Sequence, residues 1–398
     1  MKTFGKTLIA LAVIVILVVA GFFIYRGFWA KDAKEEPTSE MISNTSVPAT
    51  KLEISQKTLA NKFGFLSGGK EDADNIKENG ALWVRPHPGP FLWDSIQKDK
   101  SKDYDFSKSD EMVKNYSENG LSILATLWPF AEWDQSASSS ADSCKVSDSD
   151  EFLPSGADYI KRGGEYLPQH RCNPNDWDAY KKWVSAIVER YDGDGKNDMQ
   201  GLTSPIKYWE VMNEPDLNYK NSQNADRLNF YKQGPAEYAK LLIVTSQTIK
   251  EADNEAKVLA AGAAGGDSRF LNFYRTAFSS KEAKGAFDVG NVHCISNDEY
   301  ESFNVEPYKQ MLEGLKISKP IWVTEAEAII SSNPSISATQ QYYSTKKALE
   351  LGAERIFFTN YDFVRQDNNM PPNQSQTQIK PEFDGSNPVE VYKKITAL

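Results

Sequence analysis

The sequence predicts a single (β/α)8 barrel, also called a TIM barrel, over residues 53–398. Eight apolar runs of strand length occur in succession, and each is followed by a segment whose apolar residues have helical spacing. Most of the runs are continuously apolar, as parallel strands covered on both faces are. Two of the runs end in glutamates. A doubly wound open sheet is the alternative, but eight units in succession favour a closed barrel.

The expected strands end at prolines or polar residues. The second run stops at Pro86 and the third at Pro129, because proline cannot donate to a sheet ladder. The fourth run breaks at an Asn-Glu-Pro turn and ends at or before Pro215. The expected strands are 63–66, 81–85, 121–127, 208–214, 258–262, 289–295, 321–325 and 355–361.

The expected helices alternate with these strands. Asp176 is placed to cap the helix that begins at Trp177, and Gly352 stops the helix that precedes the eighth strand. A polar insertion at 131–174, serine-rich in its first half, separates the third strand from the helix at Trp177. The expected helices are 71–78, 108–118, 177–191, 236–252, 269–277, 306–315, 338–351 and 389–395.

The N-terminal residues predict a different kind of segment. Residues 7–25 are almost wholly apolar and are flanked by lysines and an arginine, and about 20 apolar residues span a bilayer. No clean cleavage site follows, which favours an uncleaved anchor over a cleaved signal. We therefore expect an anchor or signal at 1–28, a flexible polar linker at 29–52, and a domain at 53–398 outside the cytoplasm. A single-pass cell-membrane protein is expected, with secretion as the alternative.

The net charge bears on the binding partners, and the cysteines bear on possible disulfides. The net charge of −10 argues against nucleic acid, and nothing in the sequence sets the oligomeric state. Cys144 and Cys172 share the long insertion and could pair outside the cytoplasm, although sequence alone does not determine connectivity. Cys294 lies in an apolar strand and is expected to be a buried thiol outside any disulfide with these two cysteines.

Two strand ends carry the chemistry. Asn213 and Glu214 lie at the tip of the fourth strand, and Glu325 lies at the tip of the seventh. Two facing carboxylates can act as general acid and nucleophile in glycoside hydrolysis, because the leaving oxygen must be protonated while the anomeric carbon is attacked. A strand-end salt bridge is the alternative for each glutamate.

The run from Trp209 to Pro215 resembles the Asn-Glu-Pro signature of the retaining glycoside hydrolases with (β/α)8 barrels, and is most similar to families 39 and 5. The resemblance covers roughly 60–398. It implies that Glu214 is the acid/base and Glu325 the nucleophile. It also implies that Asn213 binds the sugar 2-hydroxyl, and that Arg85 holds the nucleophile ionised. A structural ion pair between Arg85 and Glu210 is the alternative.

The resemblance also points to substrate-binding residues, with departures from the family pattern. His293 at the end of the sixth strand matches a residue that binds substrate or nucleophile, but a satisfied core histidine is the alternative. The tryptophan platform of the eighth strand is absent, so Tyr361 or Trp128 is a candidate platform, and a core role is the alternative for Trp128. Glu327 is the rival nucleophile.

A glycine-rich acidic loop precedes the fourth strand. Asp192, Asp194 and Asp198 alternate with glycines, as in loops that bind calcium through oxygen ligands. A tight Asp-Gly turn is the alternative. No zinc or cofactor motif is visible, so no cofactor is expected for catalysis.

These observations predict a retaining glycosidase that cleaves a β-linked oligosaccharide or polysaccharide. A membrane-tethered carbohydrate-binding protein without activity is one alternative. A transglycosylase or a lyase that uses the same carboxylates is the other.

Overall fold

The computed structural model describes the parts of the chain in which the barrel lies. The chain divides into two units, Met1–Pro48 and Ala49–Leu398, and every described residue belongs to the second. The described residues are 51–66, 72–139, 141–146, 167–217, 230–294, 301–327, 333–359, 381–384 and 387–398.

Eight strands form the centre of this unit. The neighbouring strands of the described part pair in parallel, and they lie in the order β5-β4-β3-β2-β1-β8-β7-β6. The strands are β1 (Phe63–Leu66), β2 (Trp83–Arg85), β3 (Ser122–Leu127), β4 (Tyr208–Val211), β5 (Lys257–Ala260), β6 (Gly290–Cys294), β7 (Ile321–Ala326) and β8 (Ala353–Phe358).

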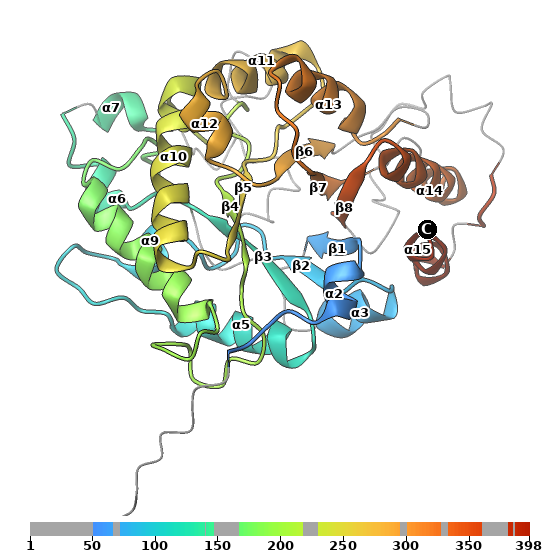
Figure 1. Ribbon diagram of the computed structural model, residues 1–398, viewed down its shortest axis with the longest axis horizontal. Coiled ribbons are helices and arrows are strands. Elements are labelled where there is room, and N and C mark those ends of the chain that lie inside the picture. Colours follow the sequence, from blue (N-terminus) through green and yellow to red (C-terminus); the bar gives the residue numbers. More distant parts are fainter. Residues whose placement is uncertain are drawn as a thin grey trace, which may run out of the picture. The chain divides into compact units, whose positions relative to one another are not determined.

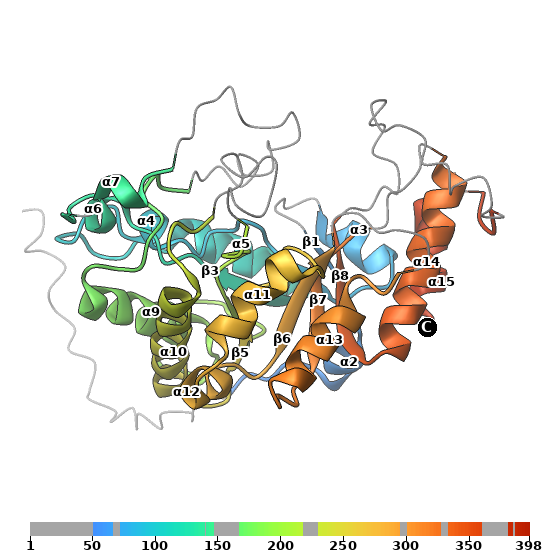
Figure 2. The same ribbon diagram turned by 90° about the horizontal axis from the view of Figure 1, so that it is seen from above.

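Helices lie outside the strands (Figures 1 and 2). Short helices that were not expected from the sequence occur before β1, after β2, in the insertion and before β6. The helices are α2 (Gln56–Ala60), α3 (Asp72–Glu78), α4 (Trp93–Ile96), α5 (Ser107–Glu118), α6 (Glu132–Gln135), α7 (Ala141–Cys144), α9 (Trp177–Tyr191), α10 (Pro235–Ala252), α11 (Ser268–Ala277), α12 (Lys281–Gly285), α13 (Val305–Gly314), α14 (Pro334–Glu350) and α15 (Pro388–Thr396).

The sheet closes between β5 and β6. Leu259 pairs with Val289, and Ala263, just beyond β5, pairs with Val292. The backbone N–H of His293 also donates to the carbonyl of Ala263 at 2.8 Å. Because the first and last strands of the order meet in this way, the expected closed barrel is confirmed and the open doubly wound sheet is wrong.

The barrel interior is layered, because alternate residues of a strand face the same side. The layer at the N-terminal ends of the strands is apolar and aromatic. Two residues further along β2, β4 and β7, the interior becomes polar at Arg85, Glu210 and Thr324. The apolar layer contains Trp83, Leu124, Leu259, Val289, Trp322 and Phe357, with Tyr208 packed against it.

Arg355 lies at the base of this apolar layer. Its guanidinium carbon is 3.9 Å from the ring centroid of Trp83 and 4.3 Å from that of Trp322. Its N–H groups donate to the carbonyls of Leu59 and Asn61 at 2.9 and 3.2 Å. Burial lowers the pKa of Arg355 to about 10, although the Tyr208 side chain opposes this lowering. The cation therefore persists at neutral pH, with ring faces, carbonyls and Tyr208 as its partners.

A disulfide joins Cys144 to Cys172 within the insertion, with 5.4 Å between the Cα atoms. The pairing that the sequence left open is therefore present, and Cys294 is buried outside it. Among the described residues, no helix is long and apolar enough to cross a membrane. The apolar segment 7–25 lies outside the described residues, so the anchor stays a prediction.

The acidic loop follows α9 and lies toward the N-terminal ends of the strands. One carboxylate oxygen each of Asp192, Asp194 and Asp198 lies within 4.8 Å of the others. The carboxylates accept backbone N–H groups of the loop, including Gly195 to Asp198 at 2.8 Å, and Lys196 pairs with Asp194 at 2.8 Å. A tight Asp-Gly turn would account for these bonds. Calcium binding by the three carboxylates stays a prediction.

Replacing Arg355 with Met should lower the free energy of unfolding by about 2–4 kcal/mol, since cation–π contacts are lost and two partly buried carbonyls lose a donor. Arg275→Met is the matched control, because Arg275 is exposed on α11. Urea unfolding measures both variants. Equal changes in the two variants would contradict the role of Arg355.

If the acidic loop holds calcium, adding Ca²⁺ should raise the melting temperature and chelation should lower it, because binding to the folded state alone stabilises it. Asp194→Asn should weaken this response. The rate at which folded protein turns over substrate should not change, since the loop lies away from the C-terminal ends of the strands. If neither calcium nor chelator changes the melting temperature, the calcium site is contradicted and the loop is a tight Asp-Gly turn.

Candidate active site

Glu214 lies just beyond β4 in a strained turn. Met212 and Glu214 have φ values of 72° and 42°, a left-handed conformation that costs non-glycine residues on the order of 1–2 kcal/mol each. Asp216 anchors this turn, since its carboxylate accepts from the N–H of Ala264 and the hydroxyl of Tyr274 at 3.0 and 3.1 Å. The tertiary contacts thus hold Glu214 in a conformation that its local sequence disfavours.

A bulge in β7 positions Glu325. Val292 pairs with Val323, but the next residue of β6, His293, pairs with Glu325, so Thr324 is an extra residue. The pairing of β7 with β8 shifts over the same residues. A bulge of this kind lets two successive residues face one side of a sheet. Thr324 and Glu325 therefore both reach the barrel interior.

Arg85 at the end of β2 joins three groups of the site. Its Nε donates to Glu210 at 2.7 Å, its Nη1 to Glu325 at 2.8 Å, and its Nη2 to Asn213 at 2.8 Å. The arginine is fully buried. The ion pair with Glu210 that the sequence offered as the alternative is present, and Arg85 also binds Glu325. That Arg85 holds a nucleophile ionised stays a prediction.

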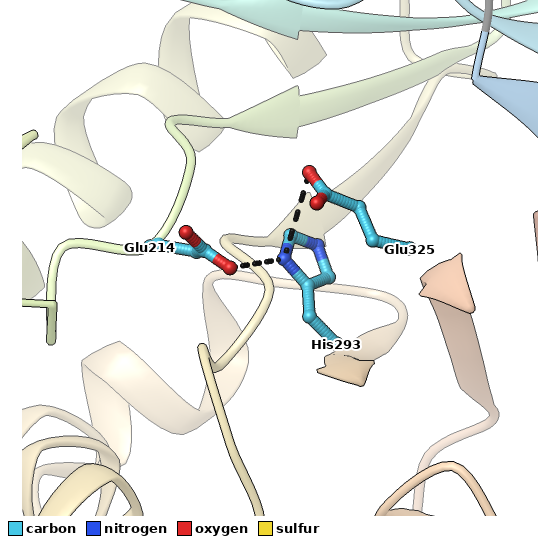
Figure 3. Close-up of side chains that lie close together, drawn as sticks. All are labelled: Glu214, His293 and Glu325. Carbon is cyan, nitrogen blue, oxygen red and sulfur yellow. Dashed lines mark hydrogen bonds and ion pairs between the residues drawn. The ribbon is translucent and has the colours of Figure 1, made fainter. Parts of the chain in front are cut away.

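His293 lies between the two glutamates (Figure 3). Its Nδ1 is 2.8 Å from an oxygen of Glu214 and 3.7 Å from one of Glu325, and its Nε2 is 2.8 Å from Thr324 Oγ1. The ring lies against the backbone of Gly262, where a Cβ would come within 2.0 Å of Nε2. A glycine is therefore required there for the imidazole to reach both glutamates.

The two carboxylates face each other at short range. An oxygen of Glu214, the Nδ1 side of His293 and an oxygen of Glu325 lie within 4.8 Å of one another. Such a trio offers ligand atoms to a metal ion. However, the guanidinium of Arg85 already places a positive charge 2.8 Å from Glu325, so the carboxylates have a cation without a metal.

Burial and neighbouring charges give the two glutamates different tendencies to hold a proton. Burial raises the pKa of Glu214 to about 7, against a lowering by Arg85. Burial also raises the pKa of Glu325, opposed by His293 and by Arg85, which binds it directly. Burial lowers the pKa of His293, which favours the neutral imidazole. At neutral pH the site therefore favours a proton on Glu214 and a charge on Glu325.

The other predicted residues have different surroundings. Trp128 is fully buried, packs against Phe230, and donates from Nε1 to the carbonyl of Pro88 at 2.7 Å, which fits the core reading. Tyr361 lies outside the described residues. Glu327 is buried beyond the end of β7, where it accepts from Thr359 Oγ1 at 2.8 Å.

Three polar residues of the interior were missed in the sequence. Thr126, Asn291 and Thr324 surround Glu210, and Thr126 Oγ1 donates to it at 2.5 Å. Asn291 lies two residues before His293, so strand alternation could have found it. Thr324 lies two residues after Trp322 of the inner apolar layer, so strand alternation also places it inside, and it is Glu325 that the bulge turns inward.

Comparison with known proteins establishes the fold. No protein-family model and no curated protein sequence matches the chain. A glucosidase from Croceicoccus marinus is similar in structure, with a TM-score of 0.54, 13% identity, and coverage of 88% of this chain and 68% of that chain. A family 39 glycoside hydrolase from Bacteroides cellulosilyticus WH2 gives a TM-score of 0.51, 15% identity, and coverage of 86% and 66%.

Xylanase 10B from Thermotoga maritima is similar over 87% of this chain and 99% of that chain, with a TM-score of 0.50 and 13% identity. At these identities the likeness concerns the fold. The chain thus has the (β/α)8 barrel fold that solved glycoside hydrolases also have.

Proposed function

We propose that the chain is a retaining glycoside hydrolase that acts by double displacement, with Glu325 as nucleophile and Glu214 as acid/base. The observation that carries the proposal is the spacing and contrasting environment of the two carboxylates. Their nearest oxygens lie within 4.8 Å. Retaining enzymes hold their carboxyls about 5–5.5 Å apart, whereas inverting enzymes need a wider gap for a water.

The first step divides between the two glutamates. Arg85 keeps Glu325 ionised by direct contact, so that its carboxylate can attack the anomeric carbon. Glu214 carries the proton that the leaving oxygen takes up. In the second step the Glu214 carboxylate takes a proton from water, and the water displaces Glu325 from the sugar.

Asn213 is the proposed contact to the substrate hydroxyl beside the anomeric carbon. Its Oδ1 accepts from Arg85, which orients the amide so that its N–H₂ group faces Glu214, to which it also donates. Such a donor would strengthen its bond as charge develops on the sugar. His293 and Tyr361 remain further proposed substrate contacts.

We further propose a β-linked glycan as substrate and a location outside the cytoplasm. The first rests on the resemblance to families 39 and 5. The second is supported by the Cys144–Cys172 disulfide, since such bonds persist in oxidising compartments. The N-terminal apolar segment would tether the barrel to the membrane.

The roles of the two glutamates predict opposite responses. Glu325→Ala should lower kcat by more than about 10⁴-fold on every glycoside, because no covalent intermediate forms. Glu214→Ala should lower kcat/KM by about 10²–10⁴-fold on glycosides with poor leaving groups, and much less on activated aryl glycosides. Azide should give a retained glycosyl azide with Glu214→Ala and an inverted one with Glu325→Ala.

A slow fluorosugar inhibitor supplies the control for this assignment. Its mass should appear on the peptide that contains Glu325. Label on Glu214 would reverse the roles, and label on Glu327 would move the nucleophile. Release of an inverted sugar by the wild type would defeat the retaining mechanism, and no hydrolysis of any glycan would favour a binding protein.

The pH dependence follows from the protonation states. Above pH about 7, Glu214 loses the proton that the leaving group needs, so kcat/KM should fall as pH rises through that value. The acidic limb should reflect protonation of Glu325, whose pKa burial raises above its ordinary value. Initial rates across pH measure both limbs. An alkaline limb that survives in Glu214→Ala would assign it to another group.

A further inference from the structure

We propose that Glu210, Asn291 and Thr324 form a directed chain of hydrogen bonds that fixes His293 in the tautomer protonated at Nε2. Nδ1 then faces Glu214 as an acceptor, so Glu214 must carry the proton. The three residues are positioning residues, because they act through His293. The catalytic consequence rests on the proposed function, whereas the tautomer itself does not.

The chain begins at Glu210, which can only accept. Its Oε2 accepts from Arg85 Nε at 2.7 Å and from Thr126 Oγ1 at 2.5 Å. Its Oε1 is 2.6 Å from Asn291 Nδ2. An amide that faces a carboxylate must present its N–H₂ group, so the orientation of Asn291 is determined.

The next link uses the hydroxyl hydrogen of Thr324. The amide oxygen of Asn291 lies 2.9 Å from Thr324 Oγ1 and can only accept, so the hydroxyl donates to it. A longer contact, 3.4 Å, leads from the same hydroxyl to Glu210 Oε1, which is also an acceptor. The single hydroxyl hydrogen is therefore directed away from His293.

The tautomer follows at the third link. Thr324 Oγ1 lies 2.8 Å from His293 Nε2 and has only a lone pair to offer, so Nε2 must carry a hydrogen. The opposite tautomer would place acceptors against each other either here or at Asn291. A second proton on the ring is disfavoured, because burial and Arg85 lower the pKa of His293 by more than Glu325 and Glu210 raise it. Nδ1 therefore holds a lone pair.

The last hydrogen bond of the chain determines whether Glu214 carries a proton. His293 Nδ1 and Glu214 Oε1 are 2.8 Å apart, a distance that requires a hydrogen between them. Because Nδ1 has none, Glu214 Oε1 supplies it. When a substrate enters, this O–H bond breaks as the glycosidic oxygen takes up the proton, and the leaving group departs as an alcohol.

Other charged groups face the same pair from neighbouring elements. Arg85 from β2 favours the ionised form of Glu214, and Glu210 from β4 opposes it. Asp216 follows Glu214 in the chain, and Glu325 comes from β7. His87 lies after β2, and burial lowers its pKa well below the ordinary value. A substitution at Thr324 leaves all of these in place, so it changes the hydrogen-bond chain alone.

The tautomer can be measured without substrate. The full chain has three histidines, so labelling with ¹⁵N-histidine gives few imidazole signals, and His293→Gln identifies the relevant one. We expect a protonated Nε2 and an unprotonated Nδ1 at neutral pH. A proton on Nδ1 overturns the proposal.

Thr324→Val and Thr324→Ser form a matched pair for the catalytic consequence. Val removes the acceptor of Nε2–H, so His293 can take the other tautomer and donate to the Glu214 carboxylate. That donation should lower the pKa of Glu214 by about one unit and move the alkaline limb of kcat/KM to lower pH. At pH 7 the rate should fall about fivefold, with little change at pH 5. Ser keeps the hydroxyl and should keep the wild-type profile.

The outcomes separate the two proposals. An equal loss at every pH in Thr324→Val, or the same altered limb in Thr324→Ser, overturns the hydrogen-bond chain while the glycosidase stands. If no glycoside is hydrolysed, the proposed function fails, and the imidazole signals of wild type and Thr324→Val still decide the tautomer.

Discussion

The buried guanidinium of Arg85 is the constraint on which the site depends. A buried cation is costly unless anions and hydrogen bonds satisfy it, and Arg85 binds Glu210 and Glu325 as well as the amide of Asn213. One cation against two carboxylates already leaves an excess of negative charge. A third carboxylate close by would increase that excess in a dry interior. Burial is the main cause that raises the pKa of Glu214, the charge of Glu210 adds to it, and Arg85 opposes both, so Glu214 keeps its proton more readily than an exposed glutamate would.

Arg355, a second buried arginine, has partners of a different kind from those of Arg85. Arg355 also lies inside the barrel, but its partners are ring faces, backbone carbonyls and the side chain of Tyr208. This set of partners suits a structural role at the lower end of the barrel. Arg85, one layer higher, is bound by groups that titrate. The change from an aromatic layer to a polar layer along the same strands thus divides the barrel into a supporting end and a reactive end.

The barrel strands and the two glutamates of the site could be predicted from the sequence, because they depend on local patterns. The eight strands follow from apolar runs, and Glu214 and Glu325 follow from the positions where those runs end. The hydrogen-bond partners could not be predicted as well. Glu325 shares the interior with Thr324 only because β7 contains a bulge, and strict strand alternation from Trp322 would turn Glu325 to the other face. Trp128 looked like a platform because its residue type suits sugars, yet the packing of aromatic rings around it is a tertiary property.

The same count of charges explains how one glutamate can serve two steps of the proposed mechanism. In the free site, Arg85 faces the charges of Glu210 and Glu325, and Glu214 is driven to remain protonated. Once Glu325 is esterified to the sugar, its charge is gone, and Arg85 faces Glu210 alone. Burial still disfavours a charge on Glu214, but the repulsion between Glu214 and Glu325 is relieved just after the proton has left for the leaving group. Glu214 can therefore persist as a carboxylate until it takes a proton from water. Its lone pairs still face the acceptor nitrogen of His293, which favours recovery of the proton and returns the site to its starting state.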